Sequence, residues 1–367
     1  MAEPLKHLYN DIFFKTLVNA MNGVLPAFQE KQFLRDIHSD GWERKELKER
    51  IRHVAGVFHA HVPGTFSKQV VLTEKIIASL RKQHTAEQGL AWIFLPEFVE
   101  RYGIEEPDTA IPFFEFLTQF VSCEFAVRPF IMRYEKRMMK QMLAWATHPD
   151  HHVRRLASEG CRPRLPWAMA LPVFKKDPSS VLPVLEKLKA DPSEYVRRSV
   201  ANNLNDISKD HPELVLQIGK RWMGNNEATD KIIKHACRGL LKKGNATALS
   251  LFKLSAVDCT LSPVKLAKKT VRIGEDLMFT FELRHSGKKT LKLRIEYGIY
   301  YLKSNGKQNR KLFKLTENQF EAGTAHVFSK KQSFLNRTTR NHYPGMHAIS
   351  IVVNGKEYEK ISFKVTA

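Results

Sequence analysis

The chain contains little cysteine, and none of it lies in a recognisable framework. Four cysteines occur among 367 residues, at Cys123, Cys161, Cys237 and Cys259. No two of them form a CxxC pair, and none combines with histidines at a metal-binding spacing. The sequence therefore suggests neither a disulfide scaffold nor a zinc site. We expect reduced thiols, no metal and no other cofactor.

Long apolar runs are also missing. The opening Met1–Lys6 lacks the apolar core of a signal peptide. No later run reaches the roughly 18 apolar residues that a membrane span requires. We therefore expect a soluble, cytoplasmic protein with no membrane partner.

Acidic residues are scarce relative to basic ones. The 59 Lys and Arg exceed the 38 Asp and Glu, so the formal net charge is +21 and the isoelectric point is about 9.8. This excess favours nucleic acid, because cationic side chains gain affinity for a phosphate backbone by releasing its counterions. A membrane surface is the rival partner, but it calls for a compact polybasic segment or a basic amphipathic helix. Here the basic residues are spread along the chain.

What the sequence does contain is an internal repeat. Residues His148–Arg155 read HPDHHVRR and residues Asp191–Arg198 read DPSEYVRR, so that the valines are 43 residues apart. A period of roughly 40 to 47 residues is typical of HEAT-like helical repeats. Apolar residues fall at helical spacing as far as about Lys253. We therefore predict an α-solenoid of HEAT-like repeats.

Beyond the helical part the apolar pattern changes to a period of two, which indicates β-strands. Turn formers such as Ser304–Gly306 and Asn354–Gly355 separate the apolar segments Leu277–Leu283, Leu291–Tyr297 and His347–Val353. About seven short strands fit here, and an immunoglobulin-like β-sandwich is the simplest arrangement for them. The predicted domains are residues 1–254, the HEAT-like repeats, and residues 255–367, the β-sandwich.

The smaller domain carries the larger net charge. It holds 21 Lys and Arg against 9 Asp and Glu, a net of +12, which leaves +9 for residues 1–254. A basic β-domain can serve solubility alone, but the positive electrostatic field of this domain favours a second clamp on DNA. Arg337, Arg340 and His342 are candidate contacts. Ordinary solvated loop charges are the alternative interpretation.

Two acidic residues stand out within the repeat. On a helix of 3.6 residues per turn, Arg155 shares a face with Glu159, and Arg198 shares a face with Asp206 one repeat later. Stacked repeats make these faces neighbours, so Glu159 and Asp206 should lie together among arginines. Carboxylates repel phosphates, which indicates a purpose other than affinity. The alternative is that they only form the i,i+4 salt bridges common in such arrays.

The sequence around the first repeat supplies further candidates for binding DNA. Trp167 would offer a flat face to a base or sugar if it lies in the basic groove. Alternatively, the Leu165–Trp167 turn simply caps the core between repeats. The candidate phosphate ligands are the arginines Arg154, Arg155, Arg162, Arg164 and Arg198. Their single sign disfavours a protein-binding scaffold, which should expose apolar or mixed-sign patches.

Two stretches resemble a known family. Residues 152–167, HVRRLASEGCRPRLPW, and residues 191–206, DPSEYVRRSVANNLND, resemble the AlkC family of alkylation-repair DNA glycosylases, which are HEAT-like proteins related to AlkD. The resemblance extends from the opening MAEPLK through Glu124–Phe130 to about Gly244. One branch of the family carries a C-terminal immunoglobulin-like domain, which matches the β-rich tail. Cys161 departs from the small polar residue expected there, which puts nothing catalytic in doubt.

The resemblance implies a monofunctional enzyme, acting as a monomer, that excises cationic N3-alkylated bases from double-stranded DNA. The implied substrates are 3-methyladenine and 3-methylcytosine, excised without base flipping. By resemblance, Glu159, Asp206 and Glu124 are the acids near the lesion, where carboxylates stabilise an oxocarbenium-like sugar. Trp167 and Arg155 are the groove residues beside the damaged nucleotide. The alternatives are a non-catalytic HEAT-repeat scaffold and a structural DNA-binding protein.

Overall fold

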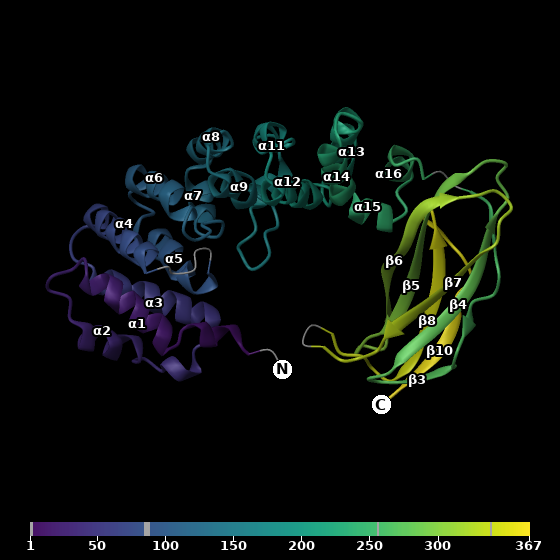
Figure 1. Ribbon diagram of the computed structural model, residues 1–367, viewed down its shortest axis with the longest axis horizontal. Helices are drawn as coiled ribbons and strands as arrows, with labels where there is room; N and C mark the ends of the chain where they lie inside the picture. Colours follow the sequence, from purple (N-terminus) through teal and green to yellow (C-terminus); the bar gives the residue numbers. More distant parts are fainter. Residues whose placement is uncertain (1–2, 84–88, 255–256, 338–339) are drawn as a thin grey trace. The chain divides into compact units, whose positions relative to one another are not determined.

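The chain changes from helices to strands near residue 255. The structure is a computed structural model that describes residues 3–83, 89–254, 257–337 and 340–367. In these residues the last helix ends at Leu251 and the first strand begins at Cys259 (Figure 1). The predicted boundary falls at Ser255–Ala256, outside the described residues. The division into functional domains therefore stays a prediction.

The helical part consists of short helices, most of which bury one apolar stripe. In the described residues they are α1 (Asp11–Asn22), α2 (Glu30–Ile37), α3 (Leu47–His61), α4 (Phe66–Lys82), α5 (Phe94–Tyr102), α6 (Pro107–Thr118), α7 (Val127–Arg133), α8 (Glu135–Trp145), α9 (His151–Gly160), α10 (Pro172–Lys176), α11 (Leu182–Leu188), α12 (Glu194–Ile207), α13 (Pro212–Trp222), α14 (Glu227–Ala236), α15 (Arg238–Lys242) and α16 (Ala246–Leu251). Three 3₁₀ turns accompany them, at Leu5–Leu8, Trp42–Arg44 and Leu90–Ile93. Every described helix is too short or too polar to span a membrane.

The chain forms two compact units. The first comprises Met1–His211 with Gly224–Ala236, and the second comprises Pro212–Met223 with Cys237–Ala367. Helix α14 therefore packs with α12 in the first unit. Helices α13, α15 and α16 belong with the strands in the second unit.

The predicted repeat is reproduced in hydrogen bonds as well as in helix positions. Helices α9 and α12 are equivalent and pack against each other. On α9, Arg154 Nη1 donates to the carbonyl oxygens of His148 and Pro149 at 3.0 and 2.7 Å. On α12, 43 residues later, Arg197 Nη1 donates to the carbonyl oxygens of Asp191 and Pro192 at 2.6 and 2.8 Å. Each arginine thus fastens its helix to the turn that precedes it.

The strands form two sheets. The described strands are β1 (Cys259–Leu261), β2 (Lys265–Leu266), β3 (Thr270–Arg272), β4 (Asp276–His285), β5 (Leu291–Leu302), β6 (Gln308–Phe320), β7 (His326–Ser333), β8 (Gly345–Val353), β9 (Lys356–Glu357) and β10 (Ile361–Thr366). In one sheet β4 pairs with β7 along most of its length and with β1 and β2 over shorter stretches. The other has the order β3-β10-β8-β5-β6, with β9 paired to β8. All pairs are antiparallel except the parallel pair β3 and β10.

A single apolar core lies between the two sheets. Every second residue of β4 points into it, including Phe279 and Phe281, and β5 contributes Ile295 and Ile299 in the same alternation. The three predicted segments are confirmed, since each lies within β4, β5 or β8. The estimate of seven strands was low, because the two-residue strands β2 and β9 are too short to leave a pattern in the sequence.

Candidate active site

A groove of about 420 Å³ lies among the segment before α7, helix α9, the loop that follows α9 and the start of α12. We call it the acidic groove. Its charged lining residues are Glu124, Arg155, Glu159 and Arg162. Its aromatic lining residues are Phe125, Trp167 and Tyr195.

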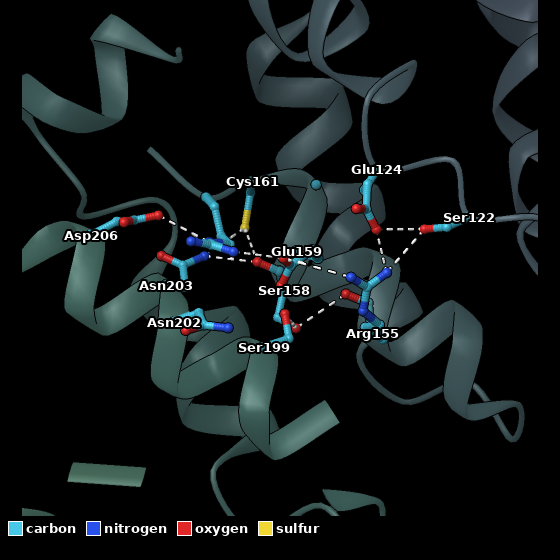
Figure 2. A network of polar contacts seen from close by, with 12 residues as sticks. Ser122, Glu124, Arg155, Ser158, Glu159, Cys161, Ser199, Asn202, Asn203 and Asp206 are labelled. Carbon is cyan, nitrogen blue, oxygen red and sulfur yellow. Dashed lines mark hydrogen bonds and ion pairs between the residues drawn. The ribbon is translucent and has the colours of Figure 1, made fainter. Parts of the chain in front are cut away.

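Arg155 connects two of the predicted acids. Its guanidinium binds the Glu124 carboxylate and donates from Nη1 to Ser122 Oγ at 3.0 Å (Figure 2). The Ser122 hydroxyl in turn donates to Glu124 Oε2 at 2.6 Å. On the other side, Arg155 Nη2 lies 3.6 Å from Glu159 Oε1, one helical turn further along α9. The arginine is therefore held between Glu124 and Glu159.

Arg162 connects the second acid to the third. Its Nη1 donates to Glu159 Oε1 at 2.7 Å, and its Nε donates to Asp206 Oδ2 at 2.9 Å. Both carboxylates are buried, with side chains 6 % and 3 % exposed. Lys209 Nζ donates to the other oxygen of Asp206 at 2.9 Å. Glu124, Arg155, Glu159, Arg162 and Asp206 thus form one row of alternating charge, which we call the charge chain.

Within the charge chain, neighbouring carboxylates stabilise the charged forms of the two arginines despite their burial. Burial alone favours the neutral form of Arg162, but the carboxylates of Glu159 and Asp206 outweigh it and raise the pKa of the guanidinium. In the same way, burial of Arg155 is outweighed by Glu124 and Glu159, and its pKa is raised. The charge chain has three acidic and two basic side chains, and the half-exposed Lys209 adds a further cation beside Asp206.

Close packing of α9 fixes the positions of Glu159 and Arg162. A Cβ on Gly160 would meet Val127 Cγ2 at 2.7 Å, so only glycine allows α9 to approach α7 this closely. Ser158 Oγ donates to Ser199 Oγ at 2.7 Å and ties α9 to α12 (Figure 2). Cys161 is fully buried and donates from Sγ to the Ala157 carbonyl at 3.1 Å. The departure at Cys161 therefore lies in the packing beneath the groove.

Trp167 is presented to solvent at the edge of the groove. Its side chain is 63 % exposed, so within the Leu165–Trp167 turn it is Leu165, and not the Trp167 ring, that packs into the core. Its backbone lies in the left-handed region with φ of 69°, which is unusual for a bulky residue and is typical of functional sites. Lys48 Nζ, from α3, donates to the Trp167 carbonyl at 2.7 Å and supports this conformation.

Known proteins share both parts of this architecture. Residues 116–239 match the family model described as "DNA alkylation repair enzyme", and residues 260–367 match that described as "Uncharacterised protein YhaZ, C-terminal Ig-like domain". The chain is 42 % identical to YhaZ of Bacillus subtilis strain 168 over 362 residues, which is 98 % of this chain and 99 % of that protein. It is 35 % identical to the alkylpurine DNA glycosylase AlkC of Pseudomonas fluorescens, solved bound to DNA containing an abasic site analog, with a TM-score of 0.94 over 100 % of both chains.

The chain belongs to the AlkC family of alkylation-repair DNA glycosylases. The predicted family is thereby confirmed, together with the predicted order of a HEAT-like α-solenoid and an immunoglobulin-like β-sandwich. The matches to the two family models fall on the helical and β-rich parts respectively.

The predicted DNA-binding residues of this AlkC-family chain fall into two groups. Arg155, Arg162 and Trp167 line the acidic groove, whereas Arg154, Arg164 and Arg198 do not. Arg154 makes a bidentate pair with the buried Asp191, at 2.6 and 3.0 Å. Arg164 makes a bidentate pair with Asp210. Arg198 is two-thirds exposed and bonds Glu194 at 2.9 Å.

Three site residues were missed in the sequence. Tyr195 stacks its ring on the Arg155 guanidinium at 4.5 Å. The only indication in the sequence was its position in the repeat, which is equivalent to that of His152. No sequence pattern indicated that Ser122 would belong to the site. Arg128 is fully buried and donates to carbonyl oxygens at both ends of the loop after α9. Its signal was a lone arginine within the apolar Glu124–Phe130 segment.

The β-rich part carries a basic hollow of its own. Its lining includes Lys303, Lys311 and Arg340, the last of which lies 5.3 Å over the Tyr301 ring. Arg337 pairs with Arg340 through their backbones but does not line the hollow. His342 is only 6 % exposed, so the structure buries this candidate contact.

Proposed function

We propose that this protein is a monofunctional DNA glycosylase that hydrolyses the N-glycosidic bond of cationic N3-alkylated bases in duplex DNA. The observation that carries the proposal is the charge chain, which holds three carboxylates, two of them in a groove with an exposed tryptophan, in a member of the AlkC family. The proposed substrates are 3-methyladenine and 3-methylcytosine. The protein acts as a monomer on double-stranded DNA.

The chemistry of these lesions explains why acids are needed. When the bond from C1′ to the base breaks, its electron pair moves onto the base nitrogen and neutralises the positive charge of the base. The base therefore leaves without a general acid. The positive charge develops on the sugar instead, and preorganised carboxylates stabilise it. Water then forms a bond to C1′ and loses a proton to a carboxylate acting as general base.

Glu159, Asp206 and Glu124 are the proposed catalytic acids. Glu159 faces the groove, whereas the carboxylate of Asp206 lies behind Arg162. We infer that Arg162 turns toward a DNA phosphate when the duplex binds, which frees Glu159 and Asp206 to face the sugar. Arg155, held by Glu124 and Tyr195, stays beside the damaged nucleotide. Trp167 offers its exposed face to the nucleotide.

Each domain has a proposed part in holding the DNA. Residues 1–254 form the glycosylase domain, and residues 255–367 form a basic clamp. The solved AlkC relative is bound to DNA containing an abasic site analog, which supports DNA as the partner. A shallow groove favours bending the duplex over rotating the base into a deep pocket, and such a bend costs a few kcal/mol that phosphate contacts offset. Arg164 and Arg198 are proposed phosphate contacts. Arg154 is retained as a prediction, although its pair with Asp191 favours a structural role.

The test is release of free 3-methyladenine and 3-methylcytosine from methylated duplex DNA in the presence of EDTA. The unaltered protein is compared with Glu159→Gln and Asp206→Asn. Loss of one electrostatic stabiliser should lower the rate by on the order of 10² to 10³. Glu105→Gln, which alters an exposed carboxylate paired with Arg133, is the matched control and should leave the rate unchanged.

DNA affinity is measured on the same variants. Rates that fall while binding persists support the proposal. Absence of release by the unaltered protein contradicts it and leaves a scaffold or a structural DNA-binding protein. In the second of these, removing an acid tightens binding, because carboxylates repel phosphates.

A further inference from the structure

A second cavity adjoins the acidic groove. It has a volume of about 290 Å³ and lies among α3, α5, the start of α7 and the loop after α9. Both hollows have the same wall residues where they meet, namely Leu90, Ile93, Ser122, Phe125 and Trp167. We call the second hollow the rear cavity. The Trp167 side chain borders both spaces.

The rear cavity combines apolar walls with the carboxyl groups of α5 and with two cationic residues, Lys48 and Arg52. Ile51, Pro96 and Pro129 contribute apolar surface, whereas Glu97 and Glu100 of α5 contribute carboxyl groups. Glu97 has a counter-ion, since Arg52 Nε lies 3.4 Å from its Oε1. Glu100 makes no hydrogen bond or ion pair with any described residue. Its carboxyl group is therefore available to a ligand.

The environment of Glu100 keeps a large share of this carboxyl protonated. Burial, reinforced by the negative charge of Glu97 and only partly offset by the positive charges of Arg52 and Arg101, raises the pKa of Glu100 to about 7. Near neutral pH the group thus exists partly as a carboxylic acid. In that form it offers an O–H donor beside a carbonyl acceptor.

That pair of groups matches one edge of adenine. The 6-amino group is a donor, and the adjacent ring nitrogen is an acceptor. Alkylation at N3 leaves this edge free in 3-alkyladenine. In 3-methylcytosine, by contrast, the methyl group occupies the ring nitrogen beside the amine. A flat purine also buries its two faces well between apolar walls.

We propose that the rear cavity is a product site that binds the excised 3-alkyladenine base, with Glu100 pairing to its amino edge. The proposal rests on the glycosylase function proposed above. The rear cavity would bind the released base in an enzyme that does not rotate the base into a deep pocket. It also makes the site selective for adenine over cytosine products. No bond forms or breaks in this step.

The test is isothermal titration of the full-length protein with free 3-methyladenine. The unaltered protein should bind the base saturably, and more weakly at pH 8.5 than at pH 6.5 as Glu100 ionises. Glu100→Leu should weaken binding by about tenfold or more, because both hydrogen bonds are lost. Glu100→Gln should retain binding and lose the pH dependence, because an amide supplies a donor and an acceptor at every pH.

Two controls make the result specific. Glu74→Leu removes another partly buried glutamate with a raised pKa, which lines neither hollow, and should change nothing. Free 3-methylcytosine should bind the unaltered protein at least about tenfold more weakly than 3-methyladenine. If Glu100→Leu fails to fold, the pH profile of Glu100→Gln still decides the question.

The outcomes separate this proposal from the proposed function. If the protein releases bases from DNA but free 3-methyladenine does not bind, or binds Glu100→Leu equally well, the product site is overturned and the glycosylase stands. If no base is released from DNA but free 3-methyladenine binds through Glu100, the cavity is a purine site and the glycosylase is overturned.

Discussion

Arg128 donates a hydrogen bond from Nε to the carbonyl oxygen of Met169 at 2.7 Å, 41 residues along the chain. Its Nη1 donates to the carbonyl oxygens of Gly160 and Arg162 at 2.9 and 2.8 Å. One fully buried cation therefore ties together both ends of the loop that carries Trp167. Burial lowers the pKa of this guanidinium to about 10, so its charge is retained at neutral pH. The three bonds compensate for removing that charge from water.

Arg128→Met should lower both stability and activity. Three buried carbonyl oxygens lose their donor, so the free energy of unfolding should fall by about 3 kcal/mol or more in a urea titration. The single-turnover rate of base release should fall more than DNA affinity, because the loop no longer holds Arg162 and Trp167 in place. Arg137→Met, at an exposed arginine paired with Asp108, should cost no more than about 0.5 kcal/mol. Equal losses in both variants would contradict the role of Arg128.

Tyr195 should act through Arg155. Its ring covers the guanidinium at 4.5 Å, and such an interaction contributes about 0.5 to 2 kcal/mol. Tyr195→Ala should therefore slow base release by roughly 2- to 30-fold, whereas Tyr195→Phe, which keeps the ring, should remain close to the unaltered protein. The measurement is the single-turnover rate at saturating protein. A large loss in the Phe variant would show that the hydroxyl, and not the ring, carries the effect.

The proximity of Glu159 to Asp206 could be predicted because periodicity alone brings equivalent helix faces together. The structure confirms part of the salt-bridge interpretation of these acids, whereas their catalytic role stays a prediction. Glu159 does pair with Arg155 at i,i+4, yet the bridge through Arg162 extends across repeats and reaches Asp206. That bridge could not be predicted, because Arg162 lies just beyond the end of α9, where helical spacing no longer gives direction.

The arginines show most clearly where sequence reasoning ends. Arg154 and Arg155 are adjacent residues of the same type, but their side chains have different contacts. Arg154 binds Asp191 and the turn before α9, whereas Arg155 lines the groove. Residue type gives charge and not direction. Hydrogen bonds such as those of Arg128 join segments about 40 residues apart through backbone carbonyls, which every residue possesses. No side-chain pattern records them.

The repeated arginines should have equivalent structural effects. Arg197→Met removes two bonds to backbone carbonyls and should cost about 1 to 2 kcal/mol in urea unfolding. Arg154→Met removes the equivalent two bonds and also leaves the buried Asp191 without its counter-ion, so it should cost about 3 kcal/mol or more. DNA affinity measured below the unfolding transition should change little in Arg197→Met. Weaker DNA binding at unchanged stability in Arg154→Met would instead support its predicted role in DNA binding.

The basic hollow of the β-rich part should contribute to the salt dependence of DNA binding. A variant with Lys303, Lys311 and Arg340 all changed to Gln removes three cations from this hollow. The slope of log affinity against log salt should become shallower by up to about 0.9 for each phosphate that the variant no longer neutralises. Lys330→Gln, on β7 in the other sheet, is the control and should leave the slope unchanged. An unchanged slope in the triple variant would remove this hollow from the DNA-binding surface.

His347 should make the β-sandwich sensitive to acid. The buried imidazole accepts from the Leu302 N–H through Nδ1 at 3.4 Å, and its Nε2 lies 2.9 Å from the Tyr343 carbonyl. This arrangement requires the neutral ring, and burial lowers the pKa of His347 below its ordinary value of 6.5. Below pH 6.5 the unfolded chain therefore binds a proton at His347 more readily than the folded chain does, and the free energy of unfolding falls as the pH falls. Between pH 7.5 and 5.5 the loss from this group should be up to about 1 kcal/mol in urea unfolding.

His347→Phe should be less stable at pH 7.5, because two hydrogen bonds are gone, but its stability should decline less with acid. Since the pKa of the neighbouring His342 is lowered as well, some acid sensitivity should remain. An undiminished decline in His347→Phe would assign the sensitivity to other groups.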